Sequence, residues 1–119
     1  EAWNSGMQDR LEVLPAHAAE GCLQDVHWAH GAFGYFPSYA VGGVIAAQLF
    51  ESLRAATPDL DERIARGDFT GVTAWLAQHV HAEGARLSSQ DLVRQVTGKP
   101  LSSIAALRYL EARYLEDAR

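Results

Sequence analysis

An apolar segment from Tyr39 to Leu53 is the feature that most restricts the fold of this 119-residue chain. Phe36 precedes a proline and therefore avoids the α region, whereas Pro37 suits the first turn of a helix, where its missing N–H would have no partner. The interior of the segment is apolar on nearly every side, through Val41, Val44, Ile45, Leu49, Phe50 and the alanines at 40, 46 and 47. The sequence therefore predicts a buried central helix over residues 37–56.

Shorter amphipathic segments lie on both sides of this helix. Hydrophobic residues at helical spacing before Pro15 predict a first helix within residues 1–15, namely Trp3, Met7, Leu11 and Leu14. Residues 57–119 contain four helix signals: Thr57-Pro58-Asp59 with Gly67; the stripe Val72, Trp75, Leu76, His79 and Val80; Ser88 and Asp91 with Gly98; and Ser102 before an inward stripe of Ile104, Leu107, Leu110 and Tyr114. Because no alternating strand or internal repeat is present, the predicted class is all-α, with about five to six helices.

Composition and charge exclude several classes of partner. With 48% hydrophobic residues, the chain is long enough for one folding unit with its own core. A net charge of −5 and the lack of any Lys/Arg run disfavour nucleic acid. No apolar run approaches the roughly 20 residues that span a bilayer, so no membrane is expected. The single cysteine, Cys22, allows no intrachain disulfide and agrees with a cytoplasmic location.

Residues 16–36 carry an unusual density of polar and aromatic side chains. Gly21, Gly31 and Gly34 interrupt any long periodicity and leave room for about two turns of helix around residues 24–29. Polar groups interleaved with glycine and aromatic residues are typical of the wall of a binding pocket. This segment is therefore predicted to be an active-site wall made of a shaped loop and a short helix.

Three motifs in and beyond this segment resemble a known family. They are Gly21-x-x-Gln24-Asp25-x-His27-Trp28, then Gly34-Tyr35-Phe36-Pro37-Ser38-Tyr39, and Ala46-Ala47-Gln48-Leu49-Phe50. Together they resemble the carboxypeptidase Taq family of zinc metallocarboxypeptidases. The likeness continues through Trp75-Leu76, His81, Gly84, Thr97-Gly98, Leu101 and Tyr109-Leu110, with Ser38 where the family usually has Thr and Gly43 where Asn is common.

The resemblance implies that the chain is the C-terminal helical part of a larger, mostly helical enzyme that releases C-terminal amino acids from peptides. In that family zinc is held by a His-Glu-x-x-His helix and a downstream Glu, and no such motif occurs in these 119 residues. The family's arginine motif, which contacts the substrate carboxylate, is expected before Glu1. Zinc is thus expected in the parent enzyme and not in this chain, because His27/His30 and His79/His81 have no carboxylate to complete a site.

The resemblance also assigns roles to individual residues. His27 and Tyr35 would be catalytic, donating hydrogen bonds to the developing oxyanion without carrying a full charge. Three further residues are predicted from their own chemistry and position to bind substrate: Gln24, Asp25 and Tyr39. Asp25 could also accept the second N–H of His27 and fix its tautomer.

Each residue has a simpler alternative. A lone histidine beside Trp28 is more often structural, Asp25 could be a solvated acid or a helix cap, Gln24 could pack against a helix, and Tyr39 could belong to the core. His79 is expected to be a core histidine, and His81 either packs or faces substrate. The tryptophans are expected to be core anchors whose N–H groups find partners: Trp3, Trp28 and Trp75.

Two hypotheses follow for the chain as a whole. In the first, it is part of an enzyme, is inactive alone and needs the missing N-terminal part of the same protein, with a peptide as substrate. In the second, it is a stand-alone, non-catalytic helical interaction module. Because the resemblance implies homodimers and because apolar contact faces would be exposed without the rest of an enzyme, self-association into a homo-oligomer is expected.

Overall fold

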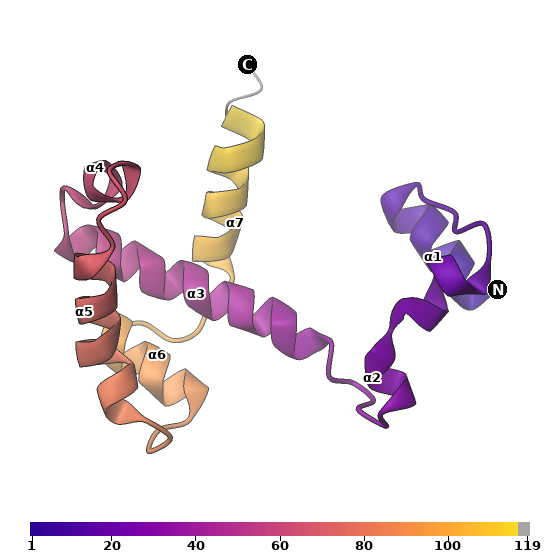
Figure 1. Ribbon diagram of the computed structural model, residues 1–119, viewed down its shortest axis with the longest axis horizontal. Helices are drawn as coiled ribbons and strands as arrows, with labels where there is room; N and C mark the ends of the chain where they lie inside the picture. Colours follow the sequence, from indigo (N-terminus) through magenta and orange to yellow (C-terminus); the bar gives the residue numbers. More distant parts are fainter. Residues whose placement is uncertain (117–119) are drawn as a thin grey trace. The chain divides into compact units, whose positions relative to one another are not determined.

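The computed structural model describes residues 1–116, in which every regular element is helical and seven are α-helices (Figure 1). The all-α class is thus confirmed. The chain divides into two compact units, Glu1–Pro37 and Ser38–Arg119. None of the helices among the described residues combines the length and the apolar character needed to cross a membrane.

The first unit contains two α-helices joined by two 3-10 turns. Helix α1 (Ala2–Leu11) ends where Glu12 adopts a left-handed conformation with φ of 55°. The turns η1 (Ala18–Glu20) and η2 (Cys22–Gln24) lead into the four-residue helix α2 (Val26–Ala29). The indole rings of Trp3 and Trp28 meet edge to face, with centroids 6.1 Å apart, and this contact joins α1 to α2.

The second unit is built around the long helix α3. Its elements are α3 (Pro37–Ala56), α4 (Leu60–Ala65), α5 (Thr70–His79), η3 (His81–Glu83), α6 (Ser89–Thr97), α7 (Ile104–Glu111) and the π-helical segment η4 (Ala112–Glu116). The signals at both ends of α6 act as expected: the Ser88 hydroxyl accepts from the Asp91 N–H, and Gly98 ends the helix in a left-handed conformation. Helix α3 begins at Pro37, the residue at which the proline rule places it.

The core of the described chain is small and does not surround α3. Its buried apolar side chains are Leu53, Leu60, Val93 and Ala105. In α3 only Gln48 and Leu53 are buried, whereas Val41 and Tyr39 are exposed, so the all-round burial expected for this helix is not found among these residues. A helix that is apolar on every side needs cover on every side, and the described helices cover only part of it.

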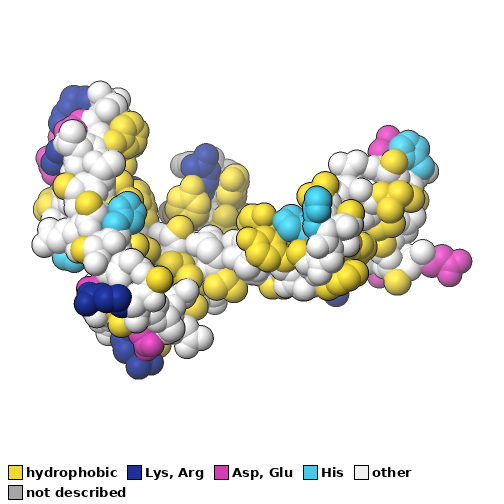
Figure 2. Space-filling model, turned by 60° about the horizontal axis from the view of Figure 1, so that its bottom comes forward, with side chains coloured by type: hydrophobic (Ala, Val, Ile, Leu, Met, Phe, Trp, Pro, Cys, Tyr) yellow, Lys and Arg dark blue, Asp and Glu magenta, His cyan; other side chains and the backbone are white. Residues whose placement is uncertain are grey.

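Helix α7 turns a different face inward from the one that its sequence indicates. The expected inward stripe is exposed, with 58% of Ile104 and 53% of Leu107 accessible, and apolar side chains are visible on the surface in Figure 2. The buried residue is Ala105, whose small side chain permits close packing. Arg108 Nη2 lies 2.8 Å from Glu51 Oε1 and pairs α7 with α3. The prediction of the inward stripe was therefore wrong for the described chain.

Gln48 ties α3 to the loop between α6 and α7. Its buried amide nitrogen donates to Pro100 O at 3.0 Å and to Thr97 Oγ1 at 3.3 Å, and its oxygen accepts from the Ser102 N–H at 3.0 Å. Both ends of the amide are thus satisfied by groups about 50 residues away in the sequence. We call this arrangement the Gln48 clamp.

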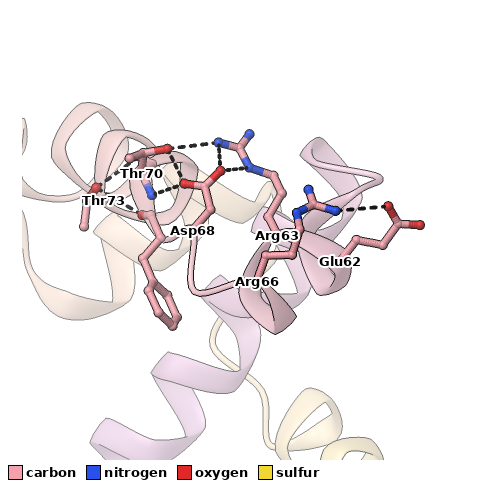
Figure 3. A network of polar contacts seen from close by, with 7 residues as sticks. Glu62, Arg63, Arg66, Asp68, Thr70 and Thr73 are labelled. Atoms are coloured by element: carbon pink, nitrogen blue, oxygen red, sulfur yellow. Dashed lines mark hydrogen bonds and ion pairs between the residues drawn. The ribbon is translucent and has the colours of Figure 1, made fainter.

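A polar network organises the corner between α4 and α5 (Figure 3). Asp68 Oδ1 accepts from the Thr70 N–H at 3.0 Å and from the Thr70 hydroxyl at 2.6 Å, and Asp68 Oδ2 accepts from Arg63 Nε at 2.9 Å. The hydrogen bonds from Thr70, with a smaller contribution from Arg63, lower the pKa of Asp68 from 3.8 to about 2. Asp68 thereby satisfies one of the otherwise unpaired N–H groups at the start of α5.

The lowered pKa of Asp68 predicts a contribution to acid stability. Because the folded state favours the ionised form, the contribution is complete above pH 4 and is lost as the pH falls from about 4 to about 2. Replacing Asp68 by Asn should lower the melting temperature at pH 5 and leave it nearly unchanged at pH 2, measured by circular dichroism. Asp59→Asn, at the start of α4, is the matched control, and equal losses from Asp68→Asn at both pH values would contradict the prediction.

Candidate functional site

Helix α2 holds Asp25 and His27 in one local arrangement. Asp25 precedes the helix and caps it, because its Oδ1 accepts from the His27 backbone N–H at 2.8 Å. The same oxygen lies 2.9 Å from His27 Nδ1. The Asp25 side chain is only 3% exposed, against 24% for His27. Asp25 is therefore a buried carboxylate that caps the helix and contacts the imidazole at the same time, rather than a solvated acid.

The loop after α2 returns aromatic rings to the His27 imidazole. The Ala32 N–H donates to His27 O at 2.8 Å, and Gly31 and Gly34 both have φ of 74°, which favours glycine. The Tyr35 ring stacks on the His27 ring, with centroids 5.1 Å apart and planes 22° apart. The sequence thus places the two candidate catalytic residues eight positions apart, and the fold of the loop brings their rings together.

Phe36 completes the surroundings of the imidazole. Its ring meets that of His27 edge to face, with centroids 5.0 Å apart. Phe36 was not among the residues predicted to form the site. Its place within the motif Gly34-Tyr35-Phe36-Pro37 is the signal that could have indicated it. We call Asp25, His27, Tyr35 and Phe36 the His27 cluster.

The contact with Asp25 determines which proton the imidazole can offer. If Nδ1–H donates to an ionised Asp25, the neutral ring has an unprotonated Nε2, which can only accept. Nε2 donates only when the ring carries both protons, and the two side chains then form an ion pair. The tautomer of His27 thus decides which of its ring nitrogens can donate to a ligand.

The two remaining candidates lie in other local environments. Gln24 is the last residue of η2 and is exposed, and its amide nitrogen donates to Ala19 O within the same pair of turns. Tyr39 belongs to the second unit, where it is the third residue of α3 and is 61% exposed. Gln24 thus has a local structural partner, and the exposure of Tyr39 does not fit its alternative role in the core.

The histidines outside the cluster have ordinary surroundings. His79 is half-buried, and the centroid of its ring lies 4.9 Å from that of Trp75, which fits the predicted packing role. His81 is exposed in η3. Within residues 1–116, no three His, Cys, Asp or Glu side chains cluster closely enough to hold a metal ion.

Comparison with known proteins gives the context of the site. The family model "Carboxypeptidase Taq (M32) metallopeptidase" matches residues 1–114. Thermostable carboxypeptidase 1 of Thermus thermophilus is 44% identical over 114 residues, which cover 96% of this chain and 22% of that protein. Carboxypeptidase 1 of Bacillus subtilis is 43% identical over 112 residues, which cover 94% of this chain and 22% of that protein.

Solved structures agree with the sequence matches. Trypanosoma cruzi metallocarboxypeptidase 1 superposes with a TM-score of 0.88 at 38% identity, over 94% of this chain and 24% of that one. A Pyrococcus furiosus carboxypeptidase superposes with a TM-score of 0.89 at 34% identity, over 95% of this chain and 23% of that one. The chain thus spans less than a quarter of the length of these relatives. It belongs to the carboxypeptidase Taq family of metallopeptidases.

Proposed function

We propose that this chain is the C-terminal helical part of a zinc-dependent metallocarboxypeptidase that releases C-terminal amino acids from peptides. The observation that carries the proposal is the His27 cluster, in which a buried carboxylate, an imidazole and a phenol-bearing ring are in contact within a chain that matches the family over residues 1–114. The reaction is inferred from the relatives, which are named as carboxypeptidases. Zinc and its ligands would come from residues outside this chain.

Within this proposal, His27 and Tyr35 stabilise charge on the scissile peptide. When both ring nitrogens of His27 are protonated, Nε2–H can donate to the carbonyl oxygen as negative charge develops there, and the Tyr35 hydroxyl is a second donor. Asp25 holds Nδ1–H and thereby fixes the direction of the ring. Donors that are in position before the reaction are more effective than donors that must reorient, since no reorganisation is needed in the transition state.

Gln24 and Tyr39 are proposed to bind substrate. The Gln24 amide oxygen can accept from a peptide N–H while its nitrogen stays bonded to Ala19 O. The Tyr39 side chain is accessible on the first turn of α3. A cytoplasmic location, a peptide partner and a homodimeric parent remain predictions.

The 119-residue chain alone should not hydrolyse peptides, because its described side chains provide no metal centre. The measurement is release of C-terminal amino acids from an unblocked peptide, with and without added zinc, compared with the same assay on a full-length relative. Zinc-dependent release by this chain would contradict the proposal. Reading the DNA upstream of the Glu1 codon gives a second test, since an in-frame His-Glu-x-x-His supports an enzyme and an adjacent start codon does not.

A stand-alone interaction module is the second candidate, favoured by the many large apolar side chains on the surface (Figure 2). They include Leu11, Leu14 and Phe33 in the first unit and Leu110, Tyr114 and Leu115 in the second. Exposed apolar patches tend to bind partners, and self-association is expected under either candidate. A start codon beside Glu1, together with a soluble complex containing no peptidase activity, would favour the module.

A further inference from the structure

Two buried polar atoms in the first unit have no hydrogen-bond partner. One is the indole nitrogen of Trp3, a donor, and the other is Asp25 Oδ2, an acceptor. Among the described residues they are the only buried side-chain nitrogen or oxygen atoms in this condition. An unsatisfied donor and an unsatisfied carboxylate oxygen are each costly inside a protein, and such groups are normally paired directly or through an internal water.

The local packing places the Trp3 indole beside the segment that leads to Asp25. The ring contacts Trp28, which lies three residues after Asp25 in the helix that Asp25 caps. A Cβ at Gly21 would lie only 3.2 Å from Trp3 Nε1, so only glycine leaves room there without a shift. Gly21 is buried and precedes Asp25 by four residues through η2. The Trp3 indole thus lies close to residues at both ends of the segment 21–28.

The free oxygen of Asp25 belongs to the same carboxylate that contacts His27. Oδ1 is fully engaged, since it accepts from the His27 backbone N–H at 2.8 Å and lies 2.9 Å from His27 Nδ1. Rotation of the carboxylate about its Cβ–Cγ bond would break both contacts, and nothing bonded to Oδ2 opposes that rotation. A donor on Oδ2 would therefore fix the plane of the carboxylate and, through Oδ1, the direction of the imidazole.

We propose that Trp3 Nε1–H and Asp25 Oδ2 are joined through one internal water molecule, which makes Trp3 a positioning residue for His27. The water donates to Oδ2 and accepts from the indole, so both unsatisfied atoms gain a partner with correct donor and acceptor roles. The inference rests on the proposed function, in which His27 donates to the oxyanion. It predicts the geometry of the His27 ring and not the rate of turnover.

The test is nuclear magnetic resonance of the chain labelled with ¹⁵N in the tryptophan indoles and histidine rings. In the wild type, the Trp3 indole proton should exchange with solvent at least about tenfold more slowly than that of Trp28, which is 45% exposed, and should show a cross-peak to a long-lived water. Trp3→Phe should change the ¹⁵N shifts of the His27 ring nitrogens, because the carboxylate beside Nδ1 becomes free to rotate. Trp28→Phe, which removes an indole from the same contact, should leave them unchanged.

A second variant keeps the proposal testable if Trp3→Phe does not fold. Asp25→Asn retains a side chain that can cap α2, and it should shift the Trp3 indole signal and remove its slow exchange. The proposal is overturned if the Trp3 and Trp28 indoles exchange at the same rate, or if Asp25→Asn leaves the Trp3 signal in place. These readouts do not involve peptide hydrolysis, so failure of the proposed function and failure of this inference are separate outcomes.

Discussion

Replacing His27 by alanine in the full-length enzyme is expected to lower kcat by roughly 10²- to 10³-fold, with a much smaller change in KM. This is the range found when one pre-positioned oxyanion donor is removed from a hydrolase. The expectation follows from the proposed role of His27. Its Nδ1 contacts the Asp25 carboxylate, and its ring stacks on that of Tyr35. Because the donor acts on charge that develops only in the transition state, ground-state binding should change little.

The measurement is steady-state hydrolysis of a peptide with a free C-terminus, with zinc content determined for each variant. His17→Ala is the matched control, since His17 is exposed and lies before η1, outside the His27 cluster. Tyr35→Phe keeps the ring that stacks on the imidazole and removes only the hydroxyl, so it separates donation from packing. If His27→Ala retained more than half of the wild-type kcat/KM at full zinc occupancy, the oxyanion role would be wrong.

Replacing Gln48 by leucine is expected to lower the free energy of unfolding by about 2–4 kcal/mol. The leucine fills most of the same volume but leaves Pro100 O and the Ser102 N–H without the amide that satisfies them. A fully buried unpaired group costs about 1–3 kcal/mol, and these two groups are part-buried, so each is expected toward the lower end of that range. The loss should be larger than the gain from added apolar surface, because Gln48 joins segments about 50 residues apart and has no local substitute.

Denaturant unfolding followed by circular dichroism measures this effect. Gln78→Leu, at an exposed position of α5, is the matched control and should change stability by less than about 0.5 kcal/mol. Comparable losses from both substitutions would mean that the Gln48 clamp contributes no more than a surface glutamine. If only Gln48→Leu lowers the free energy of unfolding, and the dependence of that free energy on denaturant concentration is unchanged, the Gln48 clamp stabilises the native state.

The helix starts and stops illustrate what could be predicted from sequence. Pro37 begins α3, Ser88 caps α6 and Gly98 ends it, since these effects depend on groups within a few residues of one another. The contact of Asp25 with His27 is also local, two residues apart, and was anticipated as one of two alternatives. The family assignment rests on motifs that are themselves short and contiguous.

The packing of those helices could not be predicted in the same way. The stripe on α7 is apolar, yet Ala105 is the residue that faces inward, because the available partner is α3 and a small side chain is needed there. The distance of 2.9 Å between Asp25 Oδ1 and His27 Nδ1 was likewise not readable from the spacing of the two residues, because it depends on the rotamers that the fold selects.

The sequence by itself determined the helical class, the family and the ends of individual helices, because local capping and backbone preferences act over one or two turns. Only the tertiary structure decided which faces are covered, how Gln48 crosses to the loop before α7, and how Tyr35 returns to His27. Those features depend on contacts between residues distant along the chain or on loop dihedral angles, neither of which is encoded in the spacing of residue types.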